Sequence, residues 1–163
     1  MKSFPILACL LFALAAKSSS IEPLPIRNHI AVNKILLVQL VNDVRKRGCQ
    51  CGDTYYPSAP PIKWSNKLEQ AALVHSNDMN LNNYFSHTAN DGSKASERID
   101  AAGYQWRAYG ENIAYGYSTE RDVVDGWVRS PGHCKNIMNR FFKEMGVARV
   151  GTYWTQVLAL QLR

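Results

Sequence analysis

The segment from residue 144 to 160 restricts the fold more than any other part of the sequence. It holds two runs rich in β-branched, aromatic and aliphatic residues, 144–150 and 153–160, and Gly151 and Thr152 stand between them. Two such runs around a short turn predict an antiparallel hairpin. The segments with helical spacing all precede this hairpin. Helices followed by strands indicate an α+β domain.

Four earlier segments carry apolar residues at the spacing of an amphipathic helix. Residues that typically start or stop a helix stand at their ends. The first segment covers residues 29–47 and stops at Gly48, the second starts after Ser65, the third starts at Ser93 or Ser96 and stops at Gly103, and the fourth starts after Thr119 and stops at Pro131. Residues 110–114 form a short β-prone segment between turn residues.

The N-terminus has the pattern of a secretory signal peptide. Lys2 precedes an uncharged apolar run, residues 4–16, which is shorter than the ~20 residues that cross a bilayer. We therefore expect a cleaved signal peptide at residues 1–15, a flexible leader at 16–28 and one domain at 29–163. This predicts a secreted, extracellular or periplasmic protein with no integral membrane segment after processing.

The charge of the chain favours anionic surfaces over nucleic acid as partners. The sequence has 19 Lys and Arg against 13 Asp and Glu, and it stays basic without Lys2. Such an excess gives a weak attraction to anionic lipids or polymers. Nucleic acid is not expected to bind, because the basic residues form no patch interleaved with aromatic residues.

Three cysteines remain after cleavage: Cys49, Cys51 and Cys134. In an oxidising compartment they predict one disulfide and one free thiol. Cys49 and Cys51 are too close in sequence for an unstrained mutual bridge, so one of them is expected to pair with Cys134. Which one pairs is left open. The alternative is a zinc site that uses the three cysteines and His133, although their spacing is not that of a usual zinc motif.

The stretch from residue 109 to 136 concentrates the residues that can carry chemistry. Glu111 lies between turn residues, and His133 lies in a Pro-Gly-His-Cys run. His87, in a Tyr-Phe-Ser-His run upstream, is the natural partner, since imidazole and carboxylate together can bind a cation or relay a proton. His75 lies on an apolar helix and is interpreted as a core histidine that bonds locally.

Five motifs in order along the chain resemble those of the CAP superfamily, which is named after cysteine-rich secretory proteins, antigen 5 and pathogenesis-related 1 proteins. They are YFSH, the GENIA run, WVxSPGHCxNIM, EMGVA and YWTQV. The similarity covers about residues 30–162 and is greatest to the compact, bacterial-type extracellular branch. It implies a three-layer α–β–α sandwich with a central antiparallel sheet.

The resemblance also implies a cleft lined by two histidines and two glutamates. His87, Glu111 and His133 match three of these positions, and Ser130 stands where many members have the second glutamate. The nearby Asp125 does not match, so the set of four is incomplete.

Three functions follow as hypotheses from this set of residues. The first is a binding module for a small ligand, a lipid or sterol, or a cell-surface polymer, in which His87 and His133 can also bind zinc or another divalent cation weakly. The second is a metal-assisted, peptidase-like hydrolase in which Glu111 is the candidate catalytic residue. The third is a structural or defence protein that acts through partner contacts, with Glu111 bonded to backbone N–H groups and to His133 as a polar staple.

Overall fold

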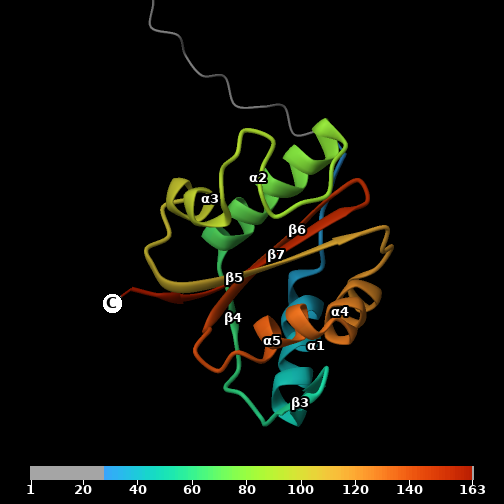
Figure 1. Ribbon diagram of the computed structural model, residues 1–163, viewed down its shortest axis with the longest axis vertical. Coiled ribbons are helices and arrows are strands. Elements are labelled where there is room, and N and C mark those ends of the chain that lie inside the picture. Colours follow the sequence, from blue (N-terminus) through green and yellow to red (C-terminus); the bar gives the residue numbers. More distant parts are fainter. Residues whose placement is uncertain (1–27, 163) are drawn as a thin grey trace, which may run out of the picture.

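The computed structural model describes residues 28–162, which form three layers (Figure 1). The helices α2 (Asn66–Asn82) and α3 (Ala95–Ala101) cover one face of the central sheet. The helices α1 (Lys34–Arg47), α4 (Glu120–Arg129) and α5 (Pro131–Met138) cover the other face. The predicted α+β sandwich is confirmed. The predicted signal peptide, and all of the predicted leader except its last residue, lie outside the described residues.

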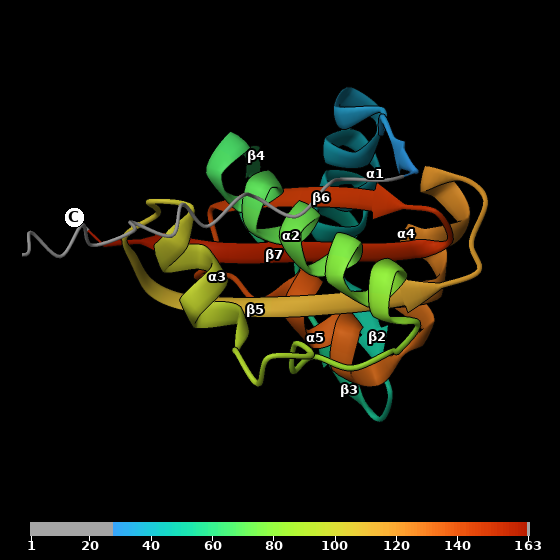
Figure 2. The ribbon, with the colours of Figure 1, turned by 90° about the horizontal axis from the view of Figure 1, so that it is seen from above.

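The central sheet runs in the order β1-β6-β7-β5. Its long strands are β5 (Trp106–Tyr115), β6 (Glu144–Val150) and β7 (Tyr153–Gln161), which lie side by side beneath α2 in Figure 2. The pairings of these three strands with one another are antiparallel. The predicted hairpin is therefore present as β6 and β7, and β5 pairs with the edge of β7 that faces away from β6.

Several short strands complete the fold. The strand β1 (His29–Ile30) pairs antiparallel with β6, whereas β4 (Lys63–Trp64) pairs parallel with it. The strands β2 (Cys49–Cys51) and β3 (Thr54–Tyr56) form a separate antiparallel pair, in which β2 contacts α5 and α4. None of the described helices is long and apolar enough to cross a membrane.

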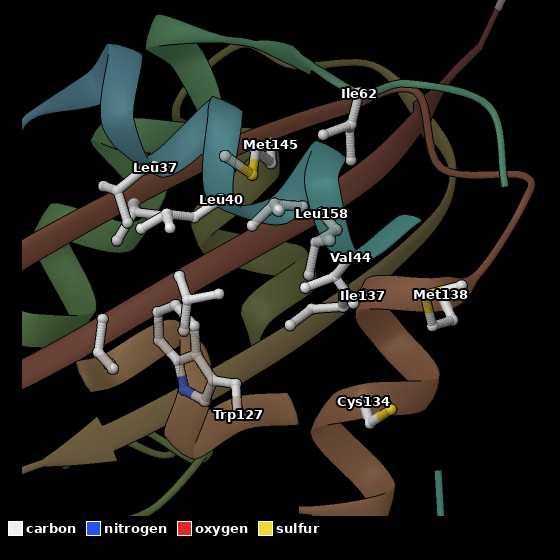
Figure 3. Close-up of a cluster of buried hydrophobic side chains, with 14 of the residues drawn as sticks. Leu37, Leu40, Val44, Ile62, Trp127, Cys134, Ile137, Met138, Met145 and Leu158 are labelled. Carbon is white, nitrogen blue, oxygen red and sulfur yellow. The ribbon is translucent and has the colours of Figure 1, made fainter. Parts of the chain in front are cut away.

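The larger of the two main apolar cores lies between the sheet and the layer of α1, α4 and α5. Its side chains come from all three helices and from β6 and β7, as Figure 3 shows for Leu37, Trp127, Ile137, Met145 and Leu158. The second core lies under α2 and α3. The sheet is covered on both faces, and residues 153–159 of β7 are accordingly all buried rather than buried at alternate positions.

The structure changes the predicted ends of two helices. The first helix begins at Lys34, because the Asn33 side chain accepts a hydrogen bond from the amide of Leu36, and its predicted first residues form β1 instead. The short helix α3 begins after Lys94 rather than at either serine. There, Glu97 accepts a hydrogen bond from the Lys94 amide at 3.1 Å.

Two elements around residues 109–136 differ from the predictions. The short segment 110–114 is part of a longer, ten-residue strand, β5. Pro131 does end α4, but it is also the first residue of α5, a helix that the sequence pattern does not predict. Proline suits this position, because N–H groups in the first turn of a helix have no partner within the helix. The N–H that proline lacks therefore costs no hydrogen bond.

Candidate functional site

Glu111 lies in the middle of β5, with its side chain only 4% exposed. One carboxylate oxygen, Oε1, accepts a hydrogen bond from His87 Nδ1 at 2.8 Å. The other, Oε2, accepts one from Arg98 Nη2 at 2.7 Å. A buried carboxylate needs such partners, because burial without them costs several kcal/mol. Both oxygens of Glu111 therefore have a strong donor.

Burial is the largest influence on Glu111 and on its own would raise the pKa of the carboxyl group. The hydrogen bond from His87, the charge of Arg98, the nearby imidazole of His75 and the hydrogen bond from Arg98 act in the opposite direction, and together they hold this pKa below its ordinary value. Glu111 is consequently an anion at neutral pH. This leaves it an acceptor for both neighbours, not a proton donor.

His87 lies on the loop after α2, and its side chain is 54% exposed. Because ionised Glu111 can only accept, the bond at 2.8 Å places the proton on Nδ1 of His87. The other ring nitrogen, Nε2, is then the one left to bind a cation or exchange a proton. A carboxylate that orients a histidine in this way is the usual second partner of a metal-binding imidazole.

The loop that carries His87 is tied to α2 by polar contacts. His75 donates from Nε2 to the carbonyl of Ser86 at 2.8 Å, and the hydroxyl of Tyr84 donates to Asp78. The amide of Asn90 also donates to Asp78, at 2.9 Å. These bonds fix the loop immediately before and after His87.

His75 itself is completely buried and belongs to the core, as its apolar helix predicts. Burial lowers its pKa and outweighs the attraction of Glu111, whose Oε1 lies 3.9 Å from Nε2. His75 is therefore neutral at pH 7. Within the described part of the chain its Nδ1 has no hydrogen-bond partner. Its position beneath the site gives it a supporting role.

His133 lies in the first turn of α5 and is half-buried. Burial lowers the pKa of its imidazole, and the charge of His87 lowers it further. His133 is thus neutral at pH 7 and near enough to His87 to sense its charge. Ser130 lies three residues earlier, at the junction of α4 and α5, where its carbonyl accepts a hydrogen bond from the Cys134 amide at 2.8 Å.

A chain of amide side chains holds α5 against β5. Asn136 donates to the backbone carbonyl of Glu111 at 3.1 Å and to the side chain of Asn112 at 2.8 Å. Asn112 donates to Gln156 at 2.8 Å and to the carbonyl of His133 at 3.3 Å. The polar staple between α5 and the sheet is thus made by amide side chains. The partners of the Glu111 carboxylate are His87 and Arg98 rather than His133.

The cysteines form a second cluster, where α5 contacts β2. Cys51 is bonded to Cys134, and Cys49 is a free thiol. Among residues 28–162, these three form the one group of at least three potential metal ligands whose atoms lie within 4.8 Å of one another. The alternative zinc site of three cysteines and His133 does not fit, since two of the sulfurs are bonded to each other and His133 is not part of the group.

Arg98 is the member of the site that no sequence motif indicates. It lies on α3, is 6% exposed, and contacts the carbonyls of His87 and Ser93 as well as Glu111. Sequence offers one weak signal, an arginine in a short helix whose neighbour Ile99 points inward. Only the packing of α3 against β5 shows that this arginine is a buried counter-ion.

Residues 38–158 match the model of the CAP family, described as the cysteine-rich secretory protein family, and the chain belongs to this family. Over 98 residues it is 37% identical to the uncharacterized protein YkwD of Bacillus subtilis, an alignment that covers 59% of this chain and 38% of that protein. The chain spans less than half the length of the curated relatives that it matches.

Two solved structures have a similar fold. An extracellular protein from Bacillus anthracis with an SCP domain aligns with a TM-score of 0.70 and 29% identity, over 78% of this chain and 40% of that one. An outer surface protein of Borrelia burgdorferi aligns with a TM-score of 0.68 and 20% identity, over 82% of this chain and 98% of that one. The second similarity supports the fold alone.

Proposed function

We propose that this chain is an extracellular CAP-domain binding module, whose site at His87, Glu111 and His133 binds a divalent cation such as zinc. One observation carries the proposal. The ionised, buried Glu111 holds His87 through Nδ1, so that Nε2 of an exposed ring is the nitrogen left to bind a cation. The similarity to an extracellular SCP-domain protein of Bacillus anthracis supports the location outside the cell.

The residues present would supply part of a zinc coordination shell. His87 would offer Nε2 and His133 a ring nitrogen. Together with Glu111 they do not form a group of three ligand atoms within 4.8 Å of one another, and zinc takes four ligands in most protein sites. Ser130 stands where a carboxylate would supply a further zinc ligand. A serine hydroxyl is a weak ligand, so solvent has to fill the remaining coordination positions. Modest affinity is expected. Arg98 neutralises Glu111 on the side away from His87 and keeps the carboxylate in place.

Calorimetric titration with zinc at neutral pH tests this proposal. Wild type should give a saturable heat, and both His87→Ala and His133→Ala should weaken binding by about tenfold or more. Glu111→Gln should weaken it less than either, because the amide can still orient His87 without its charge. His29→Ala is the matched control, since His29 is an exposed histidine on β1.

The metal proposal fails if wild type releases no saturable heat, or if both single variants bind zinc as the wild type and His29→Ala do. A binding isotherm that depends on His87 but not on His133 would reduce the site to one imidazole and the carboxylate that orients it. Circular dichroism of every variant before titration checks that the sandwich is folded.

A surface hollow beside the His87 loop favours lipid as a second ligand. It has a volume of about 300 Å³ and is lined by Asn83, Tyr84, Phe85, Tyr115 and Tyr153. Phe85 and Tyr115 are 53% and 57% exposed, with ring centroids 6.4 Å apart. Large exposed aromatic side chains that gather in this way are typical of ligand or membrane contacts.

Sedimentation with sterol-containing vesicles tests the lipid proposal. Wild type should co-sediment, and Phe85→Ser should reduce the bound fraction because it removes apolar area from the hollow. Phe141→Ser is the matched control, since Phe141 is 64% exposed and lies elsewhere, on the segment after α5. Equal binding of the two variants, or no binding by wild type, would rule out this role for the hollow.

A further inference from the structure

The three sulfur atoms beside α5 are arranged in a way that a structural disulfide does not require. Residues two apart on a strand point to the same face, so Cys49 and Cys51 of β2 both face α5. Cys51 is bonded to Cys134, and the free sulfur of Cys49 lies 3.5 Å from Cys134 Sγ. A thiol in contact with a disulfide sulfur is placed for nucleophilic attack on it.

The exposure of the three cysteines differs sharply. The bonded pair is shielded, with Cys51 1% and Cys134 0% exposed, whereas Cys49 is half-buried and reaches the surface. A thiol in solution therefore has access to Cys49 but not to the disulfide itself. Besides Cys134, the Cys49 sulfur contacts the carbonyl of Gln50 at 3.6 Å, a weak interaction that does not hold it away from the bond.

We propose that Cys49, Cys51 and Cys134 form a thiol–disulfide exchange centre that reacts with low-molecular-weight thiols through Cys49. In the first step the Cys49 thiolate attacks Cys134 Sγ. A Cys49–Cys134 bond forms, the Cys51–Cys134 bond breaks, and the electron pair leaves on Cys51, which takes up the proton that Cys49 lost. Nothing is oxidised or reduced, because one disulfide replaces another.

The second step brings in the external thiol. Its thiolate attacks the sulfur of Cys49, forms a mixed disulfide there, and releases Cys134 as a thiolate that takes up the proton of the incoming thiol. A second thiol then attacks the external sulfur of the mixed disulfide and frees Cys49. The protein gains two electrons, and two external thiols are oxidised to their disulfide. Reduction of the shielded disulfide by an external thiol thus proceeds through Cys49, the cysteine that solution can reach.

The rate at which glutathione reduces the native protein tests this centre. The reaction is run anaerobically at neutral pH, stopped with acid, and followed by mass spectrometry of alkylated protein. We expect Cys49→Ser and Cys49→Ala to slow reduction of the Cys51–Cys134 bond by about tenfold, because direct attack on the shielded sulfurs is left as the only route. If both variants are reduced within about threefold of the wild-type rate, the proposal is overturned.

Thermal unfolding of the same proteins separates exchange from loosening of the fold. Wild type and both variants should unfold at the same temperature, since Cys49 is outside the bridge, and a slower reduction then reports on the chemistry. A further variant, Cys51→Ser, should carry a Cys49–Cys134 disulfide when purified under oxidising conditions. If it is folded and retains two free thiols, the exchange geometry is refuted; if it does not fold, the reduction rates decide alone.

Discussion

At the scale of single residues, the buried carboxylate of Glu111 depends on Arg98 for its charge balance. Arg98→Ala would leave Glu111 with one hydrogen-bond partner in a site where its side chain is 4% exposed. Removal of one member of a buried ion pair typically costs about 3–5 kcal/mol, and we expect a loss near the lower end, since His87 remains. Urea unfolding measures it. A loss under about 1 kcal/mol would show that water reaches Glu111 and screens it.

Arg107→Ala is the matched control for that measurement. Arg107 is an exposed arginine near the start of β5, the strand that carries Glu111, so its loss should change the free energy of unfolding by less than about 0.5 kcal/mol. Comparable losses in the two variants would show that the ion pair to Glu111 contributes nothing specific.

The neutral, buried His75 predicts that the fold weakens in mild acid. Its pKa is lowered in the folded state from the ordinary 6.5, so the unfolded chain binds a proton more readily. Stability is therefore complete above about pH 6.5 and falls as pH drops below it, and the lowered pKa of His133 acts in the same direction. Urea unfolding between about pH 7.5 and pH 5.5 should show this decline.

A variant of His75 isolates its share of the pH effect. His75→Gln keeps a side-chain N–H that can reach the Ser86 carbonyl but cannot titrate, so the decline in acid should be smaller than in wild type. His29→Gln serves as the control, because His29 is exposed on β1 and should leave the decline unchanged. Identical pH profiles for all three proteins would mean that His75 is protonated in the folded state as easily as in the unfolded one.

At this scale the sequence points to a candidate site residue where that residue lies in a local motif. His87, Glu111 and His133 could be chosen because each belongs to a short, recognisable run. Arg98 could not, since it is 13 residues from Glu111 in sequence and meets it only after α3 has packed beside β5. A buried ion pair is a property of packing, and no local pattern encodes it. The functional roles of the three chosen residues remain predictions.

At the scale of elements, the contact between β6 and α2 depends on Gly146. A Cβ at this position would lie 2.0 Å from the amide nitrogen of Glu69 and 2.4 Å from the carbonyl carbon of Leu68, both backbone atoms of α2. The helix backbone cannot yield as a flexible side chain can. Gly146→Ala should therefore force α2 away from the sheet and lower the free energy of unfolding by about 3 kcal/mol.

Gly132→Ala is the counterpart of that variant. Among the described residues, no atom other than those of its chain neighbours and of its own helix backbone lies within 4 Å of a Cβ at Gly132. Gly132 is in the first turn of α5, and alanine is the better helix former there. Its free energy of unfolding should equal or slightly exceed that of wild type. A similar loss in both variants would indicate a general intolerance of glycine replacement and not a close approach at Gly146.

The elements that sequence predicted are those with local signals. Helices α1, α2 and α4 have apolar spacing and residues that stop or cap them, and the β6–β7 hairpin has its turn at Gly151. The strands β1 and β4 are two residues each and exist only through pairing with β6, so their sequences carry no alternation to detect. Helix α5 could not be predicted, because Pro131 is also a stop signal for α4 and the sequence does not show that the same proline starts a new helix.

At the scale of the whole molecule, one covalent bond links parts of the chain 83 residues apart. The Cys51–Cys134 disulfide ties β2, near the start of the domain, to α5 beside the candidate site. On the chain-entropy model a loop of this length is worth about 4 kcal/mol, because the cross-link restricts the unfolded chain. Cys134→Ala should remove this stabilisation completely, as it abolishes every bridge that α5 can form.

Comparison of the three single cysteine variants shows whether that stabilisation belongs to one bond or to the cluster. Cys49→Ser should unfold as wild type does, to within about 0.5 kcal/mol, since the native bridge is intact. If the Cys49 sulfur, 3.5 Å from Cys134, can take over the bridge, Cys51→Ser should retain most of the roughly 4 kcal/mol that Cys134→Ala loses, because the closed loop is nearly as long. Urea unfolding without reductant measures all three. Equal losses for Cys51→Ser and Cys134→Ala would assign the whole contribution to the native bond.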